Sequence, residues 1–349
     1  MTKSASYSTL SEFLLQAGTE YFVIDVSRTR QILDNQVLFD CELNNIPFPR
    51  PRQGHAWLCV VFWNKSMNTE HYMWFLKLPV DEQSLLMQAA RDEFLNIVVT
   101  ALGNEFQQIE KQQAELPENP FVFAPNQQQL ADCNATIRKY LKLAARPQMK
   151  AAINYLKAPS VQPWDTLAVQ DISDLALFIE DTEIQHAFMQ NIEVLPEPVC
   201  VCLFSALEGC QLTENLIDVL LNYHRQCEAS LSSMALRALA SSQTPKVQKY
   251  LEQLISSEQD LDLETLVVIA GRHWQTLVPK ANSTQDYLTL YFEKVIKTDS
   301  SHALFRGVFA DLVQIPELRV FILAMLRSST QSDSLNRAIA TLFNQQGSA

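Results

Sequence analysis

The sequence is poor in glycine, with seven among 349 residues, and no two of them form a G-x-G pair. Glycine-rich loops that cradle phosphates depend on such pairs, so nucleotide sites of the Walker and dinucleotide types are excluded. A chain with so few glycines favours helices joined by short turns over a β-rich fold. The apolar runs are also short of the roughly 20 residues that cross a bilayer, which predicts a protein without a membrane partner.

Basic residues are outnumbered, 27 Lys and Arg against 39 Asp and Glu, so the net charge is −12. The seven cysteines are odd in number and follow no framework spacing, which predicts reduced, buried thiols. No apolar leader is visible before Leu10. Together these features predict a cytoplasmic protein.

Residues 1–103 have the pattern of a small α+β module. A short helix is expected at 11–17, and β-rich runs predict strands at 21–26, 37–41, 56–63 and 71–78, with a hairpin loop at 64–70. Asp81 is expected to cap a helix whose apolar residues recur at helical spacing as far as Leu102. The module is therefore predicted to contain a small antiparallel sheet.

The strand at 56–63 is apolar on both faces, so something must cover the second face. The cover is expected from helices of the module, from the C-terminal region or from another protein. Trp57, Trp63 and Trp74 are the candidate residues for binding a partner or a second copy, because aromatic side chains anchor interfaces. Packing inside the module explains the three tryptophans almost as well.

The remaining chain is expected to be helical after a Gln- and Pro-rich linker at 104–130. Within 131–349, helix starts near 166, 182, 197, 213, 229, 244, 262, 284, 300, 316 and 332 give a period of about 32 residues for each helix pair. The stretch from Met234 through Pro245 to Ile255 resembles the HEAT family of helical repeats. The predicted fold class is α+β, with a mainly α, solenoid-like array of helical hairpins, and an irregular helical bundle is the alternative.

Several motifs of the N-terminal module resemble an uncharacterised family of gammaproteobacterial proteins, a domain of unknown function. The most distinctive ones are the run Trp74-Phe-Leu-Lys-Leu-Pro-Val-Asp-Glu-Gln-Ser-Leu85 and the run Arg91-Asp-Glu-Phe94. The resemblance implies a bacterial cytoplasmic protein and adds no activity or site.

The groups of side chains that could bind a metal or catalyse a reaction give only weak signals. The cysteine and histidine group between Cys200 and Cys227 matches no zinc spacing, and Cys200 and Cys202 would point apart on a helix. Carboxylates such as Glu180, Asp181 and Glu183 stand where a helix begins, which is the place of capping residues. The sequence therefore predicts no metal, no cofactor and no catalytic residue.

Charge is segregated along the helical region. Residues 133–164 carry six basic residues and no acidic one, including Arg138, Lys139, Lys142 and Arg146. Residues 165–228 carry twelve acidic residues and one basic residue, and Glu180, Asp181 and Glu183 among them are the candidate residues for binding a basic partner. Two explanations fit this pattern. In the first, both charged faces are solvated and their opposite charges pair across neighbouring helices. In the second, they are two surfaces that bind charged partners.

These observations favour a non-enzymatic scaffold or adaptor, which binds protein partners, one of them basic, through the helical array and the N-terminal sheet. The alternative is a nucleic-acid-associated protein that uses the basic segment 138–157, although six basic residues hold RNA or DNA only weakly. An enzyme with a pocket between the domains rests on fold analogy alone.

Overall fold

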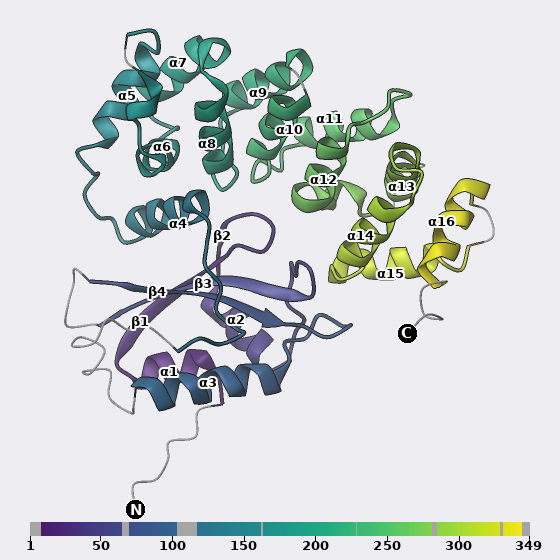
Figure 1. Ribbon diagram of the computed structural model, residues 1–349, viewed down its shortest axis with the longest axis horizontal. Helices are drawn as coiled ribbons and strands as arrows, with labels where there is room; N and C mark the ends of the chain where they lie inside the picture. The colour runs from purple at the N-terminus through teal and green to yellow at the C-terminus, as the bar shows by residue number, and fades with distance from the viewer. Residues whose placement is uncertain are drawn as a thin grey trace, which may run out of the picture. The chain divides into compact units, whose positions relative to one another are not determined.

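The computed structural model describes residues 8–64, 70–102, 117–161, 163–227, 229–280, 285–328 and 331–343. The chain forms two compact units (Figure 1). The first extends to Pro125 and includes the short segment Gln314–Pro316, and the second contains the other residues from Asn126 onward. The border between the units thus falls inside the segment 104–130 that was predicted as a linker, of which 104–116 lie outside the described residues.

A four-stranded antiparallel sheet in the order β2-β1-β3-β4 organises the first unit. Its strands are β1 Thr19–Asp25, β2 Gln31–Leu33, β3 His55–Asn64 and β4 Tyr72–Pro79. The long strand β3 pairs on both sides, and its Val60 lies opposite Val23 of β1 and Trp74 of β4. Most of the loop predicted between β3 and β4, residues 65–69, lies outside the described residues.

Three helices pack on one face of this sheet: α1 Leu10–Gln16, α2 Asn35–Glu42 and α3 Gln88–Leu102 (Figure 1). The main core of the unit lies between these helices and the sheet. Its buried residues come from both layers and include Phe13, Leu14, Leu38, Val60, Phe62, Trp74, Leu76, Phe94 and Val98. Alternation along β3 sends every second side chain into this core.

Two local predictions for this unit are wrong. Residues 37–41 lie in helix α2 and not in a strand, because the Asp34 side chain accepts a bond from Gln36 N and starts a helix there. Asp81 does not begin a helix either. Its carboxylate accepts from Gln83 N at 2.8 Å and Leu85 N at 2.9 Å, which closes a turn, and α3 begins only at Gln88.

Part of the predicted linker is built into the sheet edge. The carbonyl oxygen of Phe121 accepts from Lys77 N at 2.8 Å, and Phe123 N donates to Phe75 O at 3.0 Å. The ring of Phe123 packs against Trp57, with centroids 4.8 Å apart. Residues 121–123 therefore continue the sheet beyond β4, because two phenylalanines supply apolar area that a free linker lacks.

The described part of the second unit is helical and contains no strand. Its helices start close to the predicted positions. Their bounds are α4 Gln127–Tyr140, α5 Met149–Lys157, α6 Val169–Ala176, α7 Thr182–Asn191, α8 Glu197–Leu207, α9 Glu214–Gln226, α10 Ala229–Ala238, α11 Pro245–Ser256, α12 Leu263–Arg272, α13 Tyr287–Thr298, α14 Ala303–Leu312, α15 Pro316–Met325 and α16 Asp333–Phe343. Short 3-10 helices occur at η2 Trp164–Thr166, η3 Ile192–Val194 and η4 Trp274–Leu277.

These helices alternate between two layers. α4, α6, α8, α10, α12 and α14 contact one another in that order, while α5 contacts α7, α7 contacts α9, and α11 contacts α13. Figure 1 shows this succession from α5 to α14. The predicted fold class is confirmed as an α+β arrangement with a mainly helical C-terminal part. Among the described helices, none combines the length and apolarity needed to cross a membrane.

Candidate functional site

The three candidate tryptophans are not brought together. Trp74 is 5% exposed and belongs to the core, and the centroid of its ring lies 4.5 Å from the ring centroid of Phe62. Trp57 and Trp63 lie on the opposite face of the sheet and are half-buried. The indole Nε1 of Trp57 donates to the carbonyl oxygen of Arg52 at 3.0 Å, and the Arg52 guanidinium lies 4.7 Å above the ring. Trp74 thus presents little surface to a partner.

The basic segment and the acidic stretch bind each other. The Arg146 guanidinium is paired with Asp171, and its Nε lies 3.1 Å from Asp174 Oδ2. Lys157 is paired with Glu183. These contacts join α5 and its preceding loop to α6 and α7, so opposite charges are balanced between neighbouring helices.

The other basic candidates have mixed surroundings. Arg138 donates to the carbonyl oxygen of Ala144, and Lys139 Nζ donates to that of Leu177 at 2.9 Å. Lys142 is exposed in a left-handed conformation with φ 53°. Hydrogen bonds to carbonyl oxygens do not neutralise a cation, so Arg138 and Lys139 keep their positive charges in this segment, as does Lys142.

The acidic candidates Glu180, Asp181 and Glu183 lie at the start of α7. Asp181 caps α7, since its Oδ1 accepts from two backbone N–H groups of the first turn at 2.9 and 3.3 Å. Glu180 is exposed beside it. Further along the stretch, Glu214 and Asp218 lie 3.0 and 2.9 Å from Lys246 Nζ. Much of the acidic charge is thus used to hold helices together.

Two ion pairs with a buried carboxylate centre on Glu208, which follows α8. Its carboxylate is paired with Arg237 of α10, and it lies 2.9 Å from Arg272 Nε of α12. Burial by itself raises the pKa of Glu208, but the charges of Arg272 and Arg237 outweigh it and hold the pKa below its usual value. The three residues join three successive helices of one layer.

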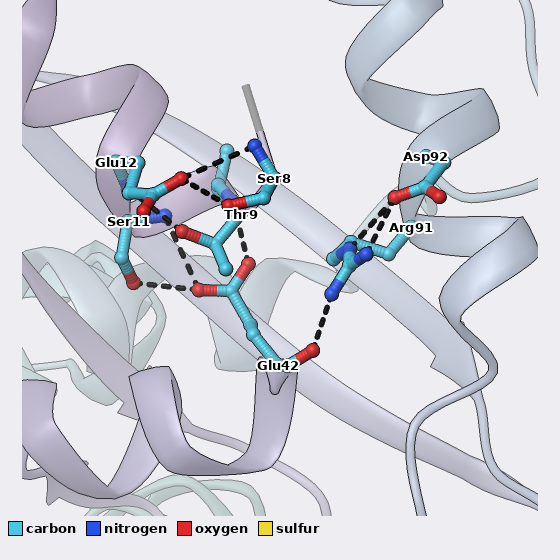
Figure 2. Close-up of polar contacts among 8 residues, drawn as sticks. Ser8, Thr9, Ser11, Glu12, Glu42, Arg91 and Asp92 are labelled. Carbon is cyan, nitrogen blue, oxygen red and sulfur yellow. Dashed lines mark hydrogen bonds and ion pairs between the residues drawn. The ribbon is translucent and has the colours of Figure 1, made fainter. Parts of the chain in front are cut away.

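A second buried carboxylate, that of Glu42, holds α1 against α2 (Figure 2). It accepts from Leu10 N at 2.6 Å, Ser11 N at 3.2 Å and Ser11 Oγ at 2.6 Å. Arg91 donates to the Glu42 carbonyl oxygen and lies 2.6 Å from Asp92 Oδ1. The pKa of Glu42 is raised by burial, which the bonds from Ser11 oppose. The start of α1 is occupied by this carboxylate, so the cluster serves packing.

The side chains of the cysteine and histidine group pack mainly in the interior of the second unit. The thiol of Cys200 lies 3.8 Å from Tyr223 Oη, and burial raises the pKa of Cys200 to about 11, far from that of a thiolate nucleophile. His224 Nδ1 lies 2.7 Å from Tyr250 Oη. None of the seven cysteines, which all lie in the described residues, forms a disulfide, and five of them are buried. Across the described ranges, no cluster of three or more His, Cys, Asp or Glu side chains is placed to hold a metal ion.

A buried histidine, His273, is expected to make the stability of the second unit depend on pH. His273 is 0% exposed, and its Nε2 lies 2.8 Å from the carbonyl oxygen of Leu236. Burial lowers the pKa of His273 from 6.5 to about 4. The bond to Leu236 and the charge of Glu208 oppose this shift, whereas the charges of Arg272 and His224 add to it. The imidazole is therefore neutral in the folded protein at neutral pH.

Acid is expected to destabilise this unit. The unfolded chain takes up a proton near the ordinary pKa, whereas folded His273 resists it, so stability is full above that value and falls as the pH drops toward 4. Between pH 7 and pH 5 the loss from this one group is about 2 kcal/mol. Urea unfolding at both pH values checks this, and the His273→Gln variant should lose about 2 kcal/mol less than the wild type. An equal loss in both proteins would show that another group is responsible.

A groove of about 690 Å³, lined by apolar and polar side chains, lies between the start of α13 and the end of α15. Leu288 and Met325 in its lining are buried, and Phe321 is 37% exposed beside them. The charged groups of the lining are Glu293, Asp286, which caps α13, and Lys280, which is paired with Glu252. The groove thus combines apolar side chains with acidic groups, which is the chemistry of a site for an apolar segment with basic neighbours.

Reasoning from the sequence did not find this groove. The signal was present in α15, whose run Val320-Phe-Ile-Leu-Ala-Met325 is apolar on every side of a helix. A helix of this kind is normally buried all round, so the run indicates more apolar surface than one neighbouring helix covers.

The sheet and the stacked helices define an α+β protein with a mainly helical C-terminal part. Over residues 5–343 the chain matches the family described as protein of unknown function (DUF3549), and it belongs to that family. The match extends over both units. No curated protein and no solved structure matches the chain.

Proposed function

We propose that the chain is a non-enzymatic adaptor that holds a segment of a protein partner in the groove between α13 and α15. The observation that carries the proposal is the combination of apolar lining residues, Leu288 and Met325, with the carboxylates of Asp286 and Glu293. An amphipathic helix with apolar anchors and basic flanking residues matches both features. A cytoplasmic location in a gammaproteobacterium, suggested by the family resemblance of the N-terminal module, is part of the proposal.

The proposal includes a HEAT-like character for the stacked hairpins. Support comes from the alternation of the helices between two layers. Along the chain from α4 to α14, each even-numbered helix contacts the next one of its own layer. Such an alternation is expected where helical hairpins stack one after another. Such arrays present extended surfaces to protein partners.

The acidic stretch 165–228 and the half-buried Trp57 and Trp63 remain candidate surfaces for further partners. The groove is the stronger site, because Asp171, Asp174 and Glu183 are already paired with basic side chains of this chain. The nucleic-acid alternative has less support for the same reason. In addition, only one of the two tyrosines in the basic segment presents its ring, since Tyr140 is 47% exposed but Tyr155 is 2% exposed and cannot stack on a base.

Site-specific photo-crosslinking in the native bacterium tests the groove. A photoreactive amino acid in place of Leu290, which lines the groove, is expected to capture one protein near stoichiometrically. Glu293→Lys should reduce this capture about tenfold, because it places a positive charge against the basic flank of the partner. The captured peptide, identified by mass spectrometry, should be an apolar segment with Lys or Arg beside it.

The matched control carries the same photoreactive group in place of Val194, an apolar residue that is 66% exposed on η3. Capture of the same set of proteins at both positions, or no capture at Leu290, would overturn the proposal. Capture of RNA or DNA by a probe at Lys142 would favour the nucleic-acid alternative instead.

A further inference from the structure

Helix α15 carries an apolar strip on its solvent side. Val320 is 63% exposed, Leu323 is 41% exposed, and the exposed Ala324 lies on the other side of Val320 from Leu323. On the other side of the same helix, Leu318 and Ile322 are completely buried. Contiguous apolar side chains at a protein surface mark an interaction site more often than scattered ones do.

This strip borders the side of α15 that lines the groove and shares Ala324 with it. Successive residues of an α-helix are separated by about 100° of rotation. On that basis Phe321 and Met325, which also line the groove, point about a third of a turn away from Val320 and about half a turn away from Leu323. An occupant of the groove therefore leaves Val320 and Leu323 uncovered, and the inference below does not rest on the proposed function.

Opposite charges bracket the strip. Glu317 lies in the first turn of α15, and Arg327 lies in the turn that continues past its end, where Arg327 N donates to the Ala324 carbonyl oxygen at 3.0 Å. Both charged residues are exposed. They stand five positions before and five positions after Ile322, so the surface of α15 is complementary to itself when it is turned end for end.

We propose that two copies of this chain associate through the outer side of α15, with the two helices antiparallel about a twofold axis near Ile322. In this arrangement Glu317 of each copy lies beside Arg327 of the other, and Val320 meets Ala324. The contact uses the same patch twice, as in most closed dimers of soluble proteins. A stable interface buries about 1,600 Å² in total, and one helix side supplies less, so the dimer forms in the micromolar to submillimolar range.

Sedimentation equilibrium of the full chain, from low micromolar to submillimolar concentration, tests the dimer. The wild type should pass from the mass of one chain to twice that mass. Val320→Asp should weaken association about a hundredfold, because it places carboxylates in the apolar centre of the contact. Val194→Asp removes a comparably exposed valine elsewhere and should leave association unchanged.

Charge reversal identifies the antiparallel pairing. Glu317→Arg and Arg327→Glu should each weaken the dimer about tenfold, since each puts like charges together twice. The double variant Glu317→Arg/Arg327→Glu restores opposite pairs across the twofold axis and should recover the wild-type affinity. Circular dichroism confirms that each variant is folded. A wild type that stays monomeric, a dimer indifferent to Val320→Asp, or a double variant as weak as the singles would overturn the proposal.

Discussion

Replacing Trp74 by alanine is expected to lower the unfolding free energy of the first unit by about 4 kcal/mol. The indole packs between the sheet and the helices, 4.5 Å from Phe62 and 6.0 Å from Phe94 between ring centroids. Removing it takes apolar area out of the core and leaves a cavity that the surrounding rings fill only in part. Urea unfolding followed by circular dichroism, together with hydrogen exchange of the β3 amides, measures the loss.

The matched variant is Trp63→Ala, at a half-buried position on the opposite face of the sheet. Trp63 has an edge contact with Phe22 at 6.0 Å, and its removal should cost about 1–2 kcal/mol. A small effect of Trp74→Ala on stability, with unchanged exchange in β3, would contradict the assignment of Trp74 to the core. It would return this tryptophan to the set of partner-binding candidates.

The second large effect is expected at Glu208. Its replacement by glutamine removes the charge that Arg237 and Arg272 share, and leaves two partly buried guanidinium groups without compensation. Breaking a buried pair costs about 3–5 kcal/mol, and the partial exposure of both arginines places the expected loss near the lower end, about 3 kcal/mol. Urea unfolding of the purified protein measures this, and α8, α10 and α12 should exchange their amide hydrogens faster together.

Glu193→Gln serves as the control for Glu208, because it makes the same chemical change at an exposed residue in η3. Its effect should stay within about 0.5 kcal/mol. If the two variants unfold alike, the three-residue network contributes no more than a surface charge. If only α8 is affected in Glu208→Gln, the network does not couple the three helices.

Helix starts in the second unit could be predicted because their signals are local. Asp181 caps the start of α7 with its own side chain, and prolines stand in the first turns of α8, α11 and α15. A cap or a first-turn proline acts within four residues, so one sequence suffices to recognise it. The confirmed fold class follows from these helices and from the strong β pattern of β3.

The failures have local and non-local causes. The cap at Asp34 that starts α2 and the turn closed by Asp81 are local signals, which the strand-forming side chains of 37–41 and the apolar period before Leu102 outweigh in the sequence. Phe121 and Phe123 stand in a segment whose composition suggests a linker, and only their pairing with β4 reveals a structural role. Tertiary packing decides this last case, and no local rule contains it.

The candidate site shows the same division between features that local sequence predicts and features that depend on packing. That opposite charges satisfy each other across neighbouring helices was one of the two explanations of the charge segregation, and the pairs of Arg146 and Lys157 agree with it. Which residues pair depends on the stacking of helices, as for Glu208 with Arg237, 29 positions apart. The groove needs Leu288 and Met325 to meet, and nothing near either residue in the sequence specifies that contact.

The bridged segment at 121–123 has a consequence for aggregation. Sheets expose rows of unpaired N–H and C=O groups at their outermost strands, and such rows template the addition of strands from other molecules. Here the segment 121–123 covers part of β4, and on the opposite side β2 covers Val23–Asp25 of β1. In the described part of the chain both margins of the sheet are thus shortened as templates for amyloid-like growth, and its long, almost entirely apolar strand β3 is paired on both sides.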